Sequence, residues 1–102
     1  STLLEIRHEL ISLSKSLFSR MEKSKSYGKT LTIKLKFEDF TQITRSKTTT
    51  NFIRSKNEIN NLMMEILNTQ IKEFTPIRLL GLGVSNLEPQ NEQHYIQLTL
   101  NF

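Results

Sequence analysis

Alternation of apolar and polar side chains between residues 30 and 37 constrains the fold of this chain more than any other feature. Apolar residues occupy every second position there, namely Leu31, Ile33, Leu35 and Phe37. Hydroxyl and ammonium groups occupy the positions between them, at Thr32, Lys34 and Lys36. A period of two predicts a β-strand with one buried face and one exposed, cationic face. Such a face suits an anionic partner, and the phosphates of a nucleic acid are the first candidate.

Basic residues are concentrated in the middle of the sequence. The 102 residues carry a formal net charge of +4, but the segment from Lys15 to Lys56 holds eleven Lys or Arg residues and three acidic ones. The remainder holds three basic and seven acidic residues. This asymmetry is typical of a domain that binds nucleic acid through a basic region. Charge alone leaves open a second interpretation, in which these side chains form an ordinary solvated surface.

Size and composition exclude several other classes of protein. A chain of 102 residues, 36% of them hydrophobic, predicts a single domain with one modest core over residues 1–102. The absence of cysteine excludes disulfide bonds and cysteine-based zinc sites. No apolar run approaches the ~18 residues of a membrane span, so we expect a cytoplasmic protein without membrane contact. His8 and His94 stand alone, and no ligand spacing or nucleophile motif predicts a metal, a cofactor or an enzyme active site.

Two helical and four extended segments follow from the periodicity of the apolar residues. We expect helices over 2–23 and 56–74, and strands over 30–37, 42–48, 77–87 and 94–102. Ser55 and Glu58 have the spacing of a capping box for the second helix, and Gly28 is expected to end the first by adopting a positive φ. The order of these elements predicts an α+β fold. Two helices would cover one face of a mostly antiparallel sheet of three to four strands and leave the other face open.

Two segments of the sequence together resemble a known family. GKTLTIKLKFEDFTQITRSKT and PIRLLGLGVSNLEPQ resemble the little finger, the C-terminal domain of Y-family lesion-bypass DNA polymerases, in its bacterial DNA polymerase IV branch. The similarity covers roughly residues 27–102, and the first helix fits in length and position. It implies a non-catalytic part of a larger polymerase, without catalytic carboxylates or a cofactor, whose parent enzyme would use Mg²⁺. It further implies a sequence-independent grip on primer-template DNA through backbone phosphates.

The resemblance assigns DNA contacts to three groups of residues. The outward side chains of the first strand are Thr32, Lys34 and Lys36. The second strand contributes side chains and amides at Gln42, Thr44, Arg45, Ser46, Lys47 and Thr48. The third strand would bring its backbone close to a phosphate at Gly81, Gly83 and Ser85. Strict alternation would turn Arg45 and Lys47 inward together with Ile43, so we expect a bulge or the end of the strand to re-aim them.

The C-terminal residues resemble the short peptide with which bacterial polymerases bind a sliding clamp. The residues that would fill the apolar cleft and anchor the peptide are Gln97, Leu98, Leu100 and Phe102. A plain edge strand is the alternative, because the three apolar residues of this set share one parity. Family members have a further strand before the first helix, so we expect a fragment whose sheet has an open edge. The tail over 94–102 is expected to fill that edge, within the chain or by exchange with a neighbouring copy in a dimer.

Two other functions remain open at this level. A protein-interaction module would act mainly through its C-terminal peptide and would carry the basic face incidentally. An RNA-binding α/β domain would need exposed aromatic side chains for base stacking, and the expected strands lack them at stacking positions. Binding to DNA that weakens steeply with salt would distinguish a DNA-binding domain from the interaction module.

Overall fold

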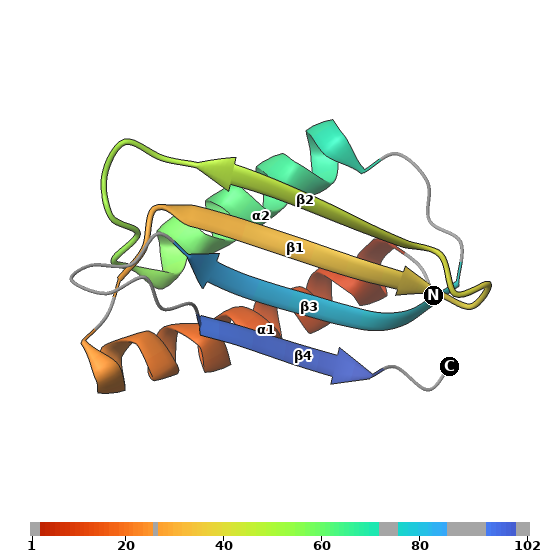
Figure 1. Ribbon diagram of the computed structural model, residues 1–102, viewed down its shortest axis with the longest axis horizontal. Coiled ribbons are helices and arrows are strands. Elements are labelled where there is room, and N and C mark those ends of the chain that lie inside the picture. The colour runs from red at the N-terminus through yellow and green to blue at the C-terminus, as the bar shows by residue number, and fades with distance from the viewer. Residues whose placement is uncertain (1–2, 26, 72–75, 86–93, 100–102) are drawn as a thin grey trace.

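A computed structural model of the chain describes residues 3–25, 27–71, 76–85 and 94–99. Within these residues two helices and four strands follow one another as α1 (Leu3–Ser24), β1 (Thr30–Phe37), β2 (Gln42–Thr48), α2 (Lys56–Gln70), β3 (Ile77–Ser85) and β4 (His94–Thr99). Figure 1 shows the strands as one layer with both helices behind it, on a single face of the sheet. This arrangement confirms the predicted α+β fold. In the described part of the chain, no helix is long and apolar enough to cross a membrane.

The sheet is antiparallel throughout, with the strand order β2-β1-β3-β4. The two central strands, β1 and β3, pair from Thr30 opposite Ser85 to Phe37 opposite Ile77. β4 pairs with β3 of the same chain, so the expectation of a C-terminal strand on the sheet within the chain is confirmed for 94–99. Residues 100–102 lie outside the described residues.

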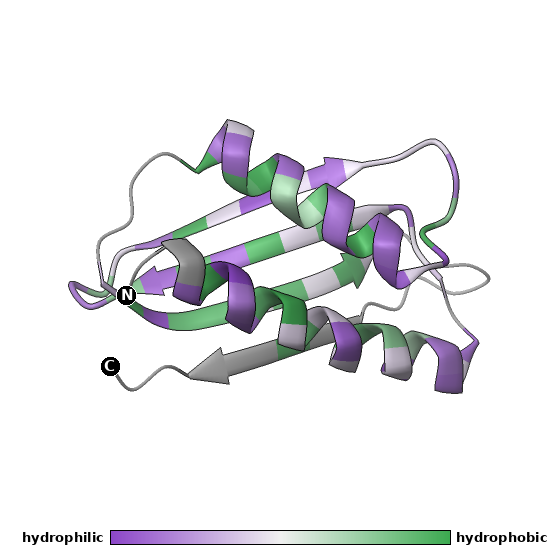
Figure 2. Cartoon of the chain, turned by 180° about the vertical axis from the view of Figure 1, so that it is seen from behind, coloured by the Kyte–Doolittle hydropathy of each residue, from purple (hydrophilic) through white to green (hydrophobic). Residues whose placement is uncertain are grey.

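The core lies between the sheet and the helices. In β1 the four apolar side chains are buried and the polar ones between them are half-buried, as the period of two predicts. Apolar residues from both helices meet them, among them Ile6, Leu10 and Leu17 from α1 and Ile59, Met63 and Ile66 from α2. Figure 2 looks onto the helices and shows hydrophilic segments alternating with hydrophobic ones along both. The helices therefore use their apolar stripes to cover one face of the sheet.

The ends of the helices depend on local polar contacts. The hydroxyl of Ser55 accepts a hydrogen bond of 3.1 Å from the N–H of Glu58, which confirms the predicted cap of α2. The expectation of a positive φ at Gly28 is wrong. Lys25 has the left-handed conformation instead, with φ of 52°, and its N–H bonds to the carbonyl of Glu22. The chain has already turned out of α1 at this residue, so the glycine does not need to do so.

Candidate nucleic-acid interface

The face of the sheet that the helices leave uncovered carries the predicted polar side chains. We call it the open face and define it by the β1, β2 and β3 residues whose register places them opposite to the buried side chains. These residues are Thr30, Thr32, Lys34, Lys36, Gln42, Thr44, Ser46, Thr48, Leu79, Gly81, Gly83 and Ser85. The structure thus brings most of the predicted DNA-contact residues onto a single surface.

Hydroxyl groups of neighbouring strands meet in pairs on the open face. The hydroxyl oxygens of Thr30 and Thr48 lie 2.8 Å apart, and those of Thr32 and Ser46 lie 2.9 Å apart. Either hydroxyl can be the donor in each pair. Because hydroxyl hydrogens rotate to suit their surroundings, these pairs can also donate to an anion placed above the sheet.

Two cations accompany these hydroxyls. Lys34 lies between Thr44 of β2 and Gly81 of β3, and Lys36 is two residues further along β1. Both lysines are half-buried, which is typical of side chains that lay their methylene groups on the surface and hold the ammonium group in water. Gly81 and Gly83 are themselves buried, so a phosphate would reach their backbone only after neighbouring side chains move.

The backbone of β2 adds hydrogen-bond donors at the edge of the sheet. The N–H of Thr49 bonds to the carbonyl of Lys29, and the N–H of Phe37 bonds to the carbonyl of Thr41. In an antiparallel ladder the pairs alternate, so the odd-numbered residues of β2 bond to β1. The even-numbered residues therefore point their N–H and C=O groups away from the sheet. These residues are Gln42, Thr44, Ser46 and Thr48.

Side-chain donors cover part of this edge. Nη1 of Arg45 donates to the carbonyl of Thr44 at 2.9 Å, and Nε2 of Gln70 approaches the carbonyl of Ser46 at 3.4 Å. Two outward acceptors are thus occupied, whereas the N–H groups of the same two residues still point outward. An edge that presents N–H groups and masks its carbonyls favours anions. Sequence reasoning missed this arrangement, because Gln70 belongs to a distant helix.

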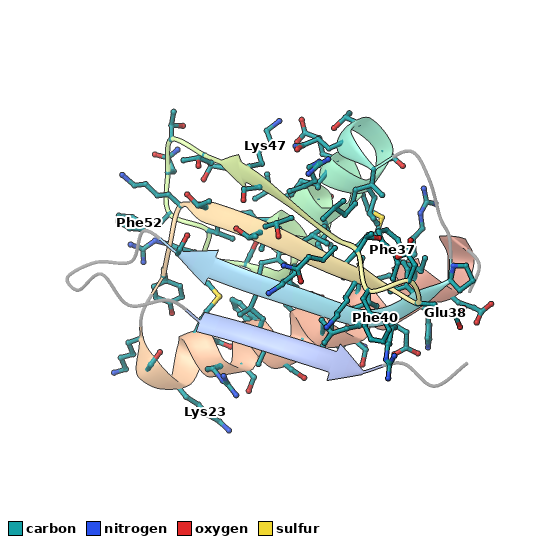
Figure 3. All side chains as sticks on the ribbon, turned by 45° about the vertical axis from the view of Figure 1, so that its right-hand side comes forward. Lys23, Phe37, Glu38, Phe40, Lys47 and Phe52 are labelled. Carbon is teal, nitrogen blue, oxygen red and sulfur yellow. The ribbon has the colours of Figure 1, made fainter. Side chains whose placement is uncertain are left out.

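The expectation that a bulge re-aims Arg45 and Lys47 is wrong. The pairing of β1 with β2 runs without a shift from Thr30 opposite Thr48 to Lys36 opposite Gln42. Both side chains therefore lie on the helix side of the edge strand. The ammonium of Lys47 forms an ion pair with the carboxylate of Glu65 on α2, and Figure 3 shows Lys47 beside that helix. Its positive charge is partly neutralised there.

A separate hollow of about 670 Å³ lies along α1, next to β4. Three serines and Ile96 line it together with three basic residues, Lys15, Arg20 and Lys23. These cations belong to the helix layer and not to the open face. The basic middle of the sequence is therefore distributed over more than one surface, and among the described residues only Lys34 and Lys36 contribute ammonium groups to the open face.

Two of the predicted clamp-binding residues, Gln97 and Leu98, belong to the edge strand β4. In the register of β4, Gln97 is opposite Gly81 and Leu98 is opposite Leu80. Leu100 and Phe102 lie outside the described residues. The backbone at 97 and 98 is thus paired with β3, so a partner that takes up this segment as a free peptide would first have to separate it from the sheet.

Comparison of the sequence with known proteins identifies its family. Residues 1–100 match the model of the impB/mucB/samB family C-terminal domain. DNA polymerase IV of Clostridioides difficile (strain 630) is 38% identical over 96 residues, which cover 94% of this chain and 26% of that protein. DNA polymerase IV of Bacteroides fragilis (strain YCH46) is 37% identical over 97 residues, which cover 92% of this chain and 27% of that protein. DNA polymerase IV of Listeria monocytogenes serotype 4a (strain HCC23) is 33% identical over 84 residues, which cover 82% of this chain and 24% of that protein.

The chain spans about a quarter of the length of these relatives. Because the family model covers nearly the whole chain and the relatives share one name, the resemblance to the C-terminal domain of the polymerase IV branch is confirmed. The chain therefore belongs to the impB/mucB/samB family of C-terminal domains, the domain that Y-family DNA polymerases of the polymerase IV branch carry.

Proposed function

We propose that this chain is the non-catalytic DNA-binding domain of a translesion DNA polymerase. It would hold primer-template DNA by its phosphates, with the open face and the β2 edge together as the contact surface. This chain would be a fragment of a larger parent protein. That parent would be a DNA-directed DNA polymerase that uses Mg²⁺ in its catalytic part. The names of the relatives support the parentage.

One observation carries the proposal. Paired hydroxyls and two lysines lie on the face of the sheet that α1 and α2 leave uncovered, and outward N–H groups lie next to them at the β2 edge. Hydroxyls, ammonium groups and backbone amides are the groups with which proteins hold phosphate oxygens, and they carry no sequence information. A surface of this composition would position a duplex without selecting its sequence.

The positions of Arg45 and Lys47 refine the proposed contacts. Arg45 would contact a phosphate at the edge of β2, beside the outward N–H groups. Lys47 would have to break its ion pair with Glu65 before it could contact a phosphate. The buried Gly81 and Gly83 would contribute by leaving room beside Lys34 and Thr32, respectively, and not by direct contact. We therefore expect the β1 lysines and the β2 hydroxyls to contribute most of the affinity.

Binding of the isolated chain to duplex DNA, measured across a series of salt concentrations, tests the proposal. We expect a dissociation constant in the non-specific range of ~10⁻⁴ to 10⁻⁶ M that rises steeply with salt and is the same for unrelated sequences. Affinity that does not change with salt, or that depends on a particular sequence, would contradict it.

We also propose that the C-terminal segment tethers the polymerase to a sliding clamp, through Gln97, Leu98, Leu100 and Phe102. The place of β4 at the edge of the sheet supports this role, because an edge strand is bound on one side only and can be released. Clamp binding that survives both Leu98→Ala and Phe102→Ala would contradict the tether.

Exchange of β4 between two copies would keep the same pairing with β3 and produce a dimer. A monomeric mass at all protein concentrations would contradict the exchange.

A further inference from the structure

One corner of the open face has an exposed aromatic side chain that does not belong to the hydrophobic core. Phe40 lies in the turn between β1 and β2, and 66% of its surface is exposed. Its φ is 69°, in the left-handed region that residues other than glycine avoid, and its N–H closes the turn by bonding to the carbonyl of Phe37 at 3.0 Å. A large ring held in a strained conformation and turned toward water has a cost without a return in packing.

The turn that carries the ring is fixed on both sides. Oδ1 of Asp39 accepts hydrogen bonds from the N–H of Thr41 at 3.0 Å and from its hydroxyl at 2.6 Å. The N–H of Glu38 bonds to the carbonyl of Pro76, which precedes β3. The exposed ring therefore belongs to a turn that hydrogen bonds hold on both sides. Figure 3 shows Phe40 over the ends of the strands, away from the helices.

A β-bulge brings an arginine to the same corner. Lys36 is opposite Leu79, but the next residue, Phe37, is opposite Ile77, so Arg78 is the extra residue of β3. Without this shift, alternation from the buried Leu80 would turn Arg78 toward the helices. The bulge instead returns Ile77 to the core, where it is 2% exposed, and leaves Arg78 in solvent.

Two cations lie close to the exposed ring as a result. Cζ of Arg78 is 5.1 Å from the centroid of the Phe40 ring, and Nζ of Lys36 is 5.7 Å from it. Both distances are within the range of a cation–π contact. We call these three residues, Lys36, Phe40 and Arg78, the Phe40 corner. Lys36 belongs also to the open face, so the corner continues the surface proposed to hold a duplex.

We infer that the Phe40 corner is a stacking site for an unpaired nucleotide at the end of the bound duplex. A nucleotide has a flat base and an anionic phosphate, and the corner offers an exposed flat ring with two cations close to it. Single-stranded DNA is bound elsewhere by this combination, with bases on aromatic rings and phosphates on basic groups. An acidic peptide would make no use of the ring, and an apolar partner would make no use of the cations. The inference rests on the proposed DNA-binding function and names a second ligand class for the same surface.

The second aromatic side chain with two cations provides a matched control. Phe52 lies 4.7 Å from Nζ of Lys29 and 5.7 Å from Cζ of Arg54, measured from its ring centroid. It is half-buried, and Figure 3 shows it at the opposite end of the sheet from Phe40. The same substitution at Phe52 therefore removes an aromatic ring that also has two cations nearby, and it leaves the Phe40 corner unchanged.

The test compares oligothymidine with an abasic oligomer of equal length, which has the same phosphates and no bases. We expect the isolated chain to bind the thymidine form at least about fivefold more tightly, as one stacked base would give. Phe40→Leu should abolish this ratio, while Phe52→Leu should preserve it. Arg78→Gln should weaken binding to both oligomers and keep the ratio. Equal binding of both oligomers by the unchanged protein, or the same loss in Phe52→Leu, would overturn the inference.

A fluorescence measurement keeps the inference falsifiable if Phe40→Leu does not fold. The sequence has no tryptophan, so Phe40→Trp places a single tryptophan in the corner, and its emission can be excited selectively over that of the two tyrosines. Its emission should be quenched by oligothymidine and not by the abasic oligomer, and the emission of Phe52→Trp should respond to neither. Quenching of both variants, or of neither, would contradict the site. A parallel titration of the unchanged protein with blunt duplex DNA separates the two proposals. Salt-dependent binding of the duplex without a preference for oligothymidine would refute the stacking site alone. Absence of duplex binding would refute the proposed function.

Discussion

The hydroxyl oxygens of Thr32 and Ser46 lie 2.9 Å apart across β1 and β2, on the face of the sheet that α1 and α2 leave uncovered. The two residues form a pair whose backbones do not bond to each other, so their side chains stand close together. A hydroxyl pair in this position needs no partner for stability, because water can replace either group. Its value lies in the two rotatable donors that it presents to an anion.

Replacement of Thr32 by valine should separate binding from stability. Thr32→Val keeps the β-branched shape and removes the hydroxyl, so we expect the free energy of unfolding to change by less than about 1 kcal/mol. A lost hydrogen bond to a charged phosphate is worth about 1.5–3 kcal/mol, so affinity for duplex DNA should fall by about ten- to a hundredfold. Urea unfolding and fluorescence anisotropy measure the two quantities. An unchanged affinity would mean that this pair does not touch DNA.

Proline at the edge of β2 should test the outward N–H groups. Ser46→Pro removes an N–H that points away from the sheet, which edge strands tolerate, so the protein should fold. DNA affinity should fall, because a phosphate donor is lost. Arg45→Pro is the matched change at a residue whose N–H bonds to β1, and it should destabilise the sheet. Equal stability of the two variants, measured by thermal unfolding, would contradict the derived hydrogen-bond pattern.

Removal of the Glu65 carboxylate should strengthen DNA binding. Lys47 and Glu65 form an ion pair in which their side chains are 39% and 46% exposed, so the pair contributes at most about 1 kcal/mol to stability. Glu65→Gln frees Lys47, and we expect severalfold tighter binding with a steeper salt dependence. Glu22→Gln, an equal charge change on α1, is the control for net charge. An equal gain in both variants would show that Lys47 has no specific part in binding.

Acid should loosen the turn that carries Phe40. Hydrogen bonds from the hydroxyl and then the N–H of Thr41 lower the pKa of Asp39 below its ordinary value. A lowered pKa in the folded state means that the stabilisation is present above the ordinary value and is lost as the pH falls through the lowered one. NMR titration should show the Thr41 amide shifting in that acidic window. Thr41→Val should move the pKa of Asp39 back up, and an unchanged pKa would contradict the assigned cause.

Much of the fold could be predicted because single residues decide it locally. The alternation from Thr30 to Phe37 sets both the bounds of β1 and its buried face, and the spacing of Ser55 and Glu58 marks the start of α2. The end of α1 was misassigned because glycine usually takes the left-handed conformation at a helix end, although another residue can adopt it at a cost of about 1–2 kcal/mol. Lys25 could therefore take the role expected of Gly28.

The site was less predictable, since it depends on register across strands. Nothing in the sequence from Gln42 to Thr48 shows that the pairing lacks a bulge, and so Arg45 and Lys47 were expected on the wrong side. The bulge that does exist, at Arg78, shifts a side chain by one residue in a segment that otherwise reads as a regular strand. Phe40 was overlooked for a different reason, because neither its exposure nor its positive φ is expected of a phenylalanine.

The most direct test of the account is the slope of log affinity against log salt concentration for two double variants. Lys34→Gln with Lys36→Gln removes both ammonium groups of the open face, and Lys15→Gln with Lys23→Gln removes two from the hollow on α1. If DNA lies on the open face, the first pair should reduce the slope by about 1.8, at about 0.9 for each lost phosphate contact, and the second should leave it nearly unchanged. A reduction as large in the α1 variant as in the open-face variant would contradict the central claim.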